Sequence, residues 1–367
     1  MSPRTDARRF DVVLLGATGF TGALTAEYLA AHSPSRARLA LAGRNQAKLE
    51  AVRDRLVRIN PQLDDVALLH ADSSDPQSLA RVAESARVVI RVYVEHHATA
   101  ERTGARIVHA CGFDSIPHDL GALFTVQQLP SDVPVTLRGV VRTNATISGG
   151  TLHSGLGQLS RPRAMLPAAA GRRRLEPRPH GRQVRTRIGR PRRDRTLDTW
   201  LIPLPTIDPD VVRRSALARP DYGPHFTYSH YAGARRAATV AGTLAGFTAA
   251  LAAVQIPPLR RAIGRRIPQG EGPSAERRDR TWFTVDIVGE GGGQRVHTQV
   301  SGADPGYTET AKMLAESALC LAFDDNPPTA GQVTTATAMG ENLLRRLGGA
   351  GISFTVITSQ TATHAGR

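Results

Sequence analysis

The sequence predicts an α/β protein built on a parallel sheet, followed by a second, mixed α+β domain. Two observations predict this fold class. In the first third of the chain, short apolar runs alternate with helix-prone segments, which is typical of strand–helix units in a parallel sheet. Further along, apolar and polar residues alternate with a period of two, which is typical of antiparallel strands with one solvated face.

The elements of the first third follow in order. Strands are expected at residues 12–15, 39–42, 66–70, 87–94 and 106–110, and helices at 23–31, 77–86 and 118–127. The segment 71–76 contains Asp, Ser and Pro, which suit the cap of the helix at 77–86. Residues 95–105 leave room for only a short helix between the fourth and fifth strands.

The later elements have a different pattern. Residues 135–143, 281–289 and 294–301 alternate as antiparallel strands, and residues 290–293 join the last two as a hairpin. Residues 309–324 and 340–347 have helical periodicity. We therefore predict a first domain over 8–128, a substrate or interaction domain over 129–325, and a C-terminal helix and strand over 326–367 that pack back on the first domain.

A glycine turn follows the first strand. Gly16 allows a sharp turn, Gly19 allows the backbone to approach a pyrophosphate, and Gly22 allows close packing of helix on strand. The helix N-terminus then attracts phosphate groups. The spacing is a variant of the dinucleotide fingerprint, and the alternative is a glycine turn that binds nothing. The sequence thus predicts a Rossmann-type cofactor site that includes Gly16, Ala17, Thr18, Gly19, Phe20 and Gly22.

Arg44 follows the second strand, where NAD-binding proteins usually have a carboxylate for the ribose 2′-hydroxyl. The planar guanidinium of arginine suits a 2′-phosphate, so NADP(H) is the predicted cofactor; a surface arginine without a role is the alternative. Asp72 and Ser73, after the third strand, complete the predicted cofactor-binding set.

Most of the net charge of +15 comes from one segment. Residues 161–195 contain 13 Arg and five Pro but few apolar residues, which predicts a disordered segment over about 154–198. A polyanion-binding arm is the alternative, but the segment lacks aromatic residues that would stack on bases. This composition argues against nucleic acid as a partner.

Several motifs together resemble the saccharopine-dehydrogenase-like oxidoreductases, and among them the actinobacterial trans-acting enoyl reductases. The motifs are RFDVVLLGATGFTG at 9–22, AGRN at 42–45, ARIVHACGFDSIPHDL at 105–120, SGGT at 148–151, DPGY at 304–307, MLAESALCLA at 313–322 and ATAMGENLL at 336–344. The resemblance implies an NADPH-dependent enzyme that reduces a carbon–carbon double bond of a polyketide or lipid intermediate. It also implies a polyketide synthase or a carrier-bound acyl chain as partner.

The chain departs from the family pattern in two places. A strand–helix segment that family members carry after the fourth strand is missing after residue 93, which leaves Tyr93 near the expected nicotinamide position. The arginine-rich segment replaces ordinary mixed-charge sequence, as a pair of compensating frameshifts would produce. The alternative function is therefore a catalytically impaired or decayed paralogue that retains at most cofactor binding.

No catalytic residue can be assigned from the sequence. Asp114, Ser115, His118 and Tyr307 are candidates for a proton donor or a substrate contact. The first two also suit a helix N-cap, which is the favoured interpretation, and Tyr307 could cover the core. His96 and His97 lack a third ligand at metal spacing, so no metal site is predicted.

Cellular location follows from three weaker features. Cys111 and Cys320 match no disulfide or metal framework, and the run 12–15 is too short for a signal peptide, so we expect a cytoplasmic protein. Residues 237–254 lack charge but are rich in Ala, Gly and Thr, which favours a buried or interface helix over a spanning one. The basic residues at 260–266 leave peripheral contact with a membrane or lipid open.

Overall fold

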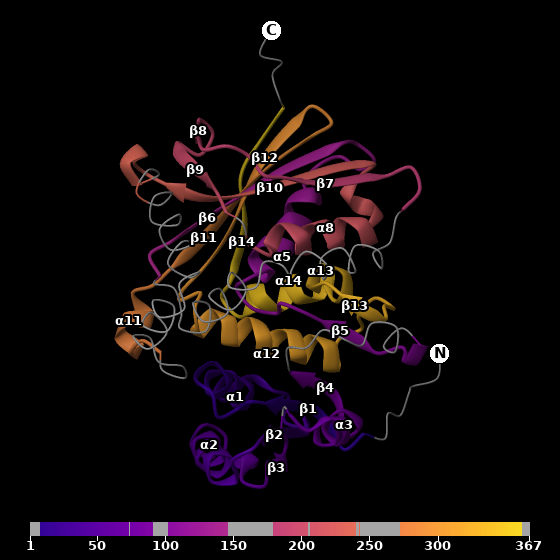
Figure 1. Cartoon of the computed structure of the whole chain (residues 1–367), viewed down its shortest axis with the longest axis vertical. Coiled ribbons are helices and arrows are strands. Elements are labelled where there is room, and N and C mark those ends of the chain that lie inside the picture. The colour runs from indigo at the N-terminus through magenta and orange to yellow at the C-terminus, as the bar shows by residue number, and fades with distance from the viewer. Residues whose placement is uncertain are drawn as a thin grey trace. The chain divides into compact units, whose positions relative to one another are not determined.

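The computed structural model describes residues 8–72, 74–90, 102–145, 179–204, 206–239, 242 and 272–361. The chain forms two compact units, each made of two separate stretches (Figure 1). Unit 1 contains Met1–Phe113 and Tyr307–Gly351, and unit 2 contains Asp114–Gly306 and Ile352–Arg367. The predicted boundaries at 128 and 325 treat each domain as continuous, whereas both units are discontinuous in sequence.

Unit 1 contains a four-stranded parallel sheet in the order β3-β2-β1-β4. Its strands are β1 (Phe10–Leu15), β2 (Leu39–Gly43), β3 (Ala67–His70) and β4 (Ala86–Ile90). The helices that connect them are α1 (Phe20–His32), α2 (Gln46–Ile59), with the short 3-10 turn η1 (Pro61–Leu63), and α3 (Pro76–Ser85). This is the order of the first four strands of a Rossmann fold, so the predicted fold class is confirmed.

Alternating residues of the strands supply two separate cores. On one face, Val12 and Leu14 of β1 pack with α1 and α2, and on the other face Val13 packs with Val82 of α3. The first core also contains Ala315, Ala318 and Leu319 of α12 (Thr308–Phe323), a helix from the distant end of the chain. Both faces of the parallel sheet are therefore covered, as such sheets require.

Polar contacts fix α12 in unit 1. Tyr28 of α1 donates a hydrogen bond of 2.8 Å to Glu316. Arg346 of α14 (Gly340–Gly349) binds Glu316 at 3.1 Å and Asp324 at 2.6 Å. Helix α12 is therefore part of unit 1, whereas the domain boundaries predicted from the sequence place it in the second domain.

The expected fifth strand exists but has another partner. The strand β5 (Arg106–Val108) pairs in parallel with β13 (Gly331–Val333), and the two form a separate sheet. The short helix α13 (Thr335–Ala338) follows β13. The strand expected at 106–110 is therefore present over Arg106–Val108, although it lies outside the four-stranded sheet. Tyr93, His96 and His97 lie outside the described residues.

Unit 2 contains an eight-stranded mixed sheet in the order β14-β12-β11-β6-β10-β9-β8, with β7 paired to β10. Its central strands are β6 (Val135–Thr143), β10 (His225–Ala234), β11 (Phe283–Gly291) and β12 (Gln294–Gly302), and β14 (Ser353–Thr361) lies at one end of the order. The predicted hairpin is confirmed, because Gly291 pairs with Gln294 across the turn. Helices α5 (Ile116–Val126) and α8 (Asp208–Ala218) pack on this sheet, and the short η2 (Pro220–Tyr222) and α11 (Ala275–Asp279) lie in its connections.

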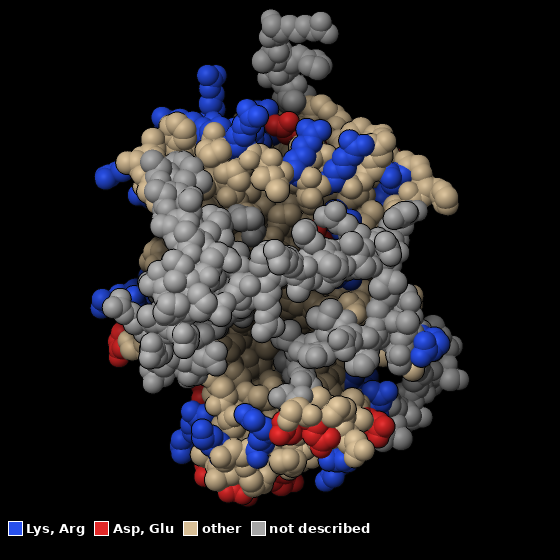
Figure 2. Space-filling view, viewed as in Figure 1, with Lys and Arg blue, Asp and Glu red and all other residues tan. Residues whose placement is uncertain are grey.

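Part of the arginine-rich segment is ordered, so the prediction of disorder is wrong for residues 179–198. The strand β7 (Gln183–Arg187) pairs with β10, and β8 (Arg192–Asp194) pairs with β9 (Thr199–Pro203). Main-chain hydrogen bonds form these ladders although most side chains of β7 and β8 are exposed. Arg138 also binds the buried Asp194 at 2.8 Å. On the upper surface of this unit, as Figure 2 shows it, basic side chains are more frequent than acidic ones, among many uncharged residues. Residues 154–178 lie outside the described part of the chain.

No helix among the described residues is long and apolar enough to cross a membrane. The uncharged stretch predicted to be a buried helix lies mostly outside those residues.

A buried carboxylate joins three strands of unit 2. Asp286 of β11 is 1% exposed and accepts hydrogen bonds from Arg142 at 2.6 Å, His297 at 2.9 Å and Gln299 at 2.8 Å. Burial raises the pKa of Asp286, but the hydrogen bonds from His297 and Gln299 and the charge of Arg142 outweigh it, so the pKa lies below its usual value. The ionised carboxylate therefore stabilises the folded sheet.

We expect Asp286→Asn to lower the free energy of unfolding at neutral pH by about 2–4 kcal/mol, because Arg142 loses its charge partner. The folded pKa lies below the unfolded value, so this contribution is complete above the unfolded pKa and disappears as the pH falls through the folded one. Urea unfolding between neutral pH and about pH 3 checks this, since wild type and variant should converge only below about pH 4. Asp198→Asn is the control, because Asp198 pairs with Arg193 while 81% exposed and should change little. A wild-type-to-variant difference independent of pH would contradict the prediction.

Candidate cofactor site

The turn between β1 and α1 brings six of the predicted cofactor residues together. Gly16 has a φ of +87°, in the left-handed region that favours glycine, and its N–H donates to the carbonyl of Ala42 at 2.9 Å. Gly19 donates to the carbonyl of Gly16 at 3.0 Å and is the N-cap of α1. These bonds close a tight loop directly at the carboxyl end of the central strand.

Gly22 lies against the turn itself. A Cβ at this position would lie 2.1 Å from the carbonyl oxygen of Gly16 and 3.2 Å from the Cα of Ala17. Only a residue without a side chain allows this approach of helix to strand. By contrast, a Cβ at Gly19 would lie 3.5 Å from the same oxygen, an ordinary contact. The lack of a side chain at Gly19 is therefore not required by the packing of the turn.

The surface of the turn suits an anionic ligand. Gly16, Thr18 and Gly19 are exposed, whereas Ala17 is fully buried in the core below them. Because Gly19 has no side chain to cap α1, the first turn of the helix presents its N–H groups and its positive dipole end at this surface. The turn can therefore hold a pyrophosphate.

Arg44 and Asp72 follow the two neighbouring strands, β2 and β3. Because β1, β2 and β3 are parallel and adjacent, their carboxyl ends lie along one edge with the glycine turn. Arg44 is exposed, and its charge contributes to a lowered pKa of Asp72, behind the hydrogen bonds from the backbone and hydroxyl of Ser74. Those bonds, of 2.9 and 2.8 Å, give Asp72 a role in the turn before α3. Ser73 lies outside the described residues.

The four catalytic candidates separate between the units. Tyr307 lies in unit 1, where its ring contacts Phe20 edge to face with centroids 4.9 Å apart. It thereby lies beside the first residue of α1, which the sequence could not indicate across almost 300 residues. Asp114, Ser115 and His118 belong to unit 2.

The favoured helix-cap interpretation of Asp114 and Ser115 is only partly correct. Ser115 is the N-cap of α5 and its carbonyl accepts from the N–H of Asp119 at 2.8 Å, but its hydroxyl makes no capping hydrogen bond. Asp114 is exposed, whereas His118 is 2% exposed and lies in a buried polar cluster with Asp208 and His230. Sequence reasoning missed Asp208 and His230, because no short spacing connects them to His118.

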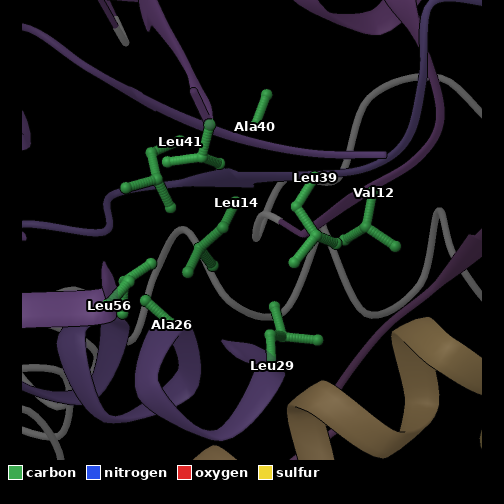
Figure 3. A pocket seen from close by; sticks show the side chains of 9 residues that line it. Val12, Leu14, Ala26, Leu29, Leu39, Ala40, Leu41 and Leu56 are labelled. Carbon is green, nitrogen blue, oxygen red and sulfur yellow. The ribbon is translucent and has the colours of Figure 1, made fainter. Parts of the chain in front are cut away.

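A small gap in the core of unit 1 is separate from this site (Figure 3). Side chains of β1, β2, α1 and α2 point into it, and all of them are apolar. An apolar lining without a polar group does not hold a dinucleotide phosphate, so the gap is part of the core. The residues that line it are Val12, Leu14, Ala26, Leu29, Leu39, Ala40, Leu41, Leu56 and Val66.

Comparison with known proteins identifies this type of site. The family model described as the saccharopine dehydrogenase NADP binding domain matches residues 12–114. Unit 1 thus contains an NADP-binding domain of the saccharopine dehydrogenase type, and the predicted cofactor is confirmed. The glycine turn, Arg44 and Asp72 all fall inside the matched residues.

Two mycobacterial relatives match almost the full length. The trans-acting enoyl reductase of Mycobacterium tuberculosis is 33% identical over 424 residues, which cover 96% of this chain and 98% of the relative. The trans-acting enoyl reductase of Mycobacterium leprae is 30% identical with the same coverage. The chain belongs to the trans-acting enoyl reductase family. Among solved structures, the apo saccharopine dehydrogenase (L-Glu forming) of Saccharomyces cerevisiae has a TM-score of 0.49 and 10% identity, over 95% of this chain and 100% of that one.

The alignments also show that this chain lacks segments that its relatives have. They run over 424 residues although the chain has 367, so these relatives carry segments that have no counterpart here. This finding supports the prediction of a missing segment. Its position after residue 93 stays a prediction.

The two glycines of the turn should respond differently to substitution. We expect Gly22→Ala to lower the free energy of unfolding by about 2–4 kcal/mol, because its Cβ would collide with the carbonyl of Gly16. Gly19→Ala should leave the melting temperature nearly unchanged but weaken NADPH binding at least about tenfold, because a methyl group would obstruct a pyrophosphate held close to the backbone. Thermal unfolding and fluorescence titration with NADPH measure the two effects. If Gly19→Ala binds NADPH as wild type does, the turn does not carry the pyrophosphate.

Proposed function

We propose that this protein is an NADP(H)-dependent enoyl reductase that acts in trans on a carrier-bound polyketide or lipid intermediate. The observation that carries the proposal is the glycine turn, in which Gly22 contacts the backbone at Gly16 and α1 begins at an exposed Gly19. The turn occurs on the central strand β1 of a β3-β2-β1-β4 sheet, beside the point where the strand order reverses. The names of the relatives support the reaction class.

Different residues of unit 1 bind different parts of the cofactor. The turn and the N-terminus of α1 hold the pyrophosphate, and Arg44 pairs with the 2′-phosphate that distinguishes NADPH from NADH. Tyr307 packs on Phe20 and so supports the start of α1. When bound, NADPH supplies a hydride from its nicotinamide to the acceptor carbon. Tyr307, Asp114, Ser115 and His118 stay candidates for the proton donor.

The proposed partners follow from the same relatives. An enzyme that acts in trans takes its substrate from another protein, so we infer a polyketide synthase or a carrier-bound acyl chain as partner. We also propose that the protein is located in the cytoplasm and makes peripheral contact with a membrane or lipid.

Arg44→Ala should weaken NADPH binding about tenfold or more while NADH binding changes little, because only NADPH carries the phosphate that Arg44 would contact. Titration of cofactor fluorescence with both cofactors measures the change. Arg36→Ala is the matched control, since Arg36 is also exposed but lies before β2, at the opposite edge of the sheet. Equal losses for NADPH and NADH, or the same loss in Arg36→Ala, would remove Arg44 from the site.

A second candidate function is a catalytically impaired relative that keeps the cofactor site. The observation that favours it is the sequence that the mycobacterial relatives have and this chain lacks. Loss of a strand–helix segment next to the nicotinamide position would affect hydride transfer more than phosphate binding, because the phosphates bind at the glycine turn.

One assay separates the two candidates. We expect the protein to oxidise NADPH with a 2-enoyl thioester on an acyl carrier protein, with the saturated thioester identified by mass spectrometry. Gly19→Ala should lose this activity without unfolding. Saturable, Arg44-dependent NADPH binding with no reduction of enoyl thioesters of several chain lengths would establish the impaired relative instead.

A further inference from the structure

A buried polar cluster in unit 2 lies outside the cofactor site. His118 comes from the first turn of α5, Asp208 is the first residue of α8, and His230 comes from the middle of β10. Both helices pack on the sheet, so the three side chains meet between helices and strand. One ligand-type atom from each residue lies within 4.8 Å of the other two.

The cluster is closed to solvent, and three of its polar atoms lack a hydrogen-bond partner. His118 is 2% exposed, and Asp208 and His230 are each 5% exposed. Within the described part of the chain, both ring nitrogens of His230 and Oδ1 of Asp208 are buried without a hydrogen-bond partner. Each buried polar atom left in this state is unfavourable. A ligand that these atoms can contact together would remove that cost.

Neighbouring groups orient the three side chains. The hydroxyl of Tyr228 lies 3.3 Å from Nδ1 of His118, which leaves Nε2 of that ring for another contact. Thr206 donates a hydrogen bond to Oδ2 of Asp208, and Nε2 of His230 lies 3.6 Å from the same oxygen. Such outer contacts on imidazole and carboxylate are typical around metal ligands.

We propose that His118, Asp208 and His230 bind one divalent transition-metal cation of the zinc class. Two imidazole nitrogens and one carboxylate oxygen form a common protein ligand set for Zn²⁺ and leave a fourth position for water or a substrate atom. Tetrahedral zinc with bonds of about 2.1 Å places its ligands about 3.4 Å apart. The separation of 3.6 Å between Asp208 and His230 is already close to that value, and small side-chain rotations close the remainder. The prediction from the sequence that no metal site is present considered only His96 and His97.

The test uses the full-length protein without an affinity tag, produced in cells grown with added zinc. We expect about one zinc per chain by elemental analysis, and a fall in melting temperature of roughly 5 °C or more when a chelator removes the metal. X-ray absorption of the zinc protein should show nitrogen and oxygen ligands with the scattering of two imidazoles. A sulfur shell would assign the metal to Cys111 or Cys320 and overturn the proposal.

Variants locate the metal. Asp208→Asn and His230→Ala should each reduce the zinc content at least about tenfold, because each removes one of three ligands. His225→Ala is the matched control, since His225 begins the same strand β10 but is exposed, and its zinc content should equal that of wild type. If His230→Ala does not fold, the X-ray absorption of the wild-type protein and the zinc content of the conservative Asp208→Asn variant still test whether the cluster binds zinc. A folded wild-type protein that contains no zinc and gains no stability when zinc is added would overturn the site.

Discussion

The contact of Gly22 with the backbone at Gly16 is the constraint on which unit 1 depends. Because no side chain separates them, α1 crosses the end of β1 closely enough for Ala26 and Leu29 to enter the core with Leu14. The same approach puts the N-terminus of α1 at the exposed surface of the turn, where a phosphate can reach it. Packing at this edge and exposure of the helix N-terminus therefore have one geometric cause, whereas a Cβ at Gly19 would meet no collision.

Short sequence patterns predicted most elements of unit 1, but they did not predict that helix α12 packs in this unit. The strands β1 to β3 and the glycine turn are encoded in runs of neighbouring residues, so the sequence shows them directly. Helix α12 is different, because Ala315, Glu316, Ala318 and Leu319 are buried on several faces and the helical period does not point to one partner. Its position depends on contacts with Tyr28 and Arg346, residues about 290 positions before and 30 after Glu316. Periodicity predicted the helix but could not assign it to a unit.

In unit 2 the prediction erred in another way, because the arginine-rich composition of a segment suggested disorder where the backbone forms strands. The hairpin of β11 and β12 was predictable from alternation and from the glycines at 291–293, of which Gly292 and Gly293 adopt positive φ. The strands β7 and β8 contain arginines that are exposed at the sheet margin, and composition alone suggested disorder. A ladder requires main-chain groups, and the ion pair of Arg138 with the buried Asp194 anchors this margin. Charge density in a sequence therefore does not exclude an edge strand.

The same distinction applies to the sites. The cofactor turn is a local motif of seven residues, and sequence reasoning predicted its members and the preference for NADP(H). The buried cluster of unit 2 is assembled from His118, Asp208 and His230, which α5, α8 and β10 bring together, so only the fold shows it. Leaving three polar atoms of the cluster without a hydrogen bond would cost about 1–3 kcal/mol each, a large part of the stability of a domain. A fold that maintains such a cluster without a bound partner would be less stable than one with apolar residues there, which is the physical reason to expect an occupant.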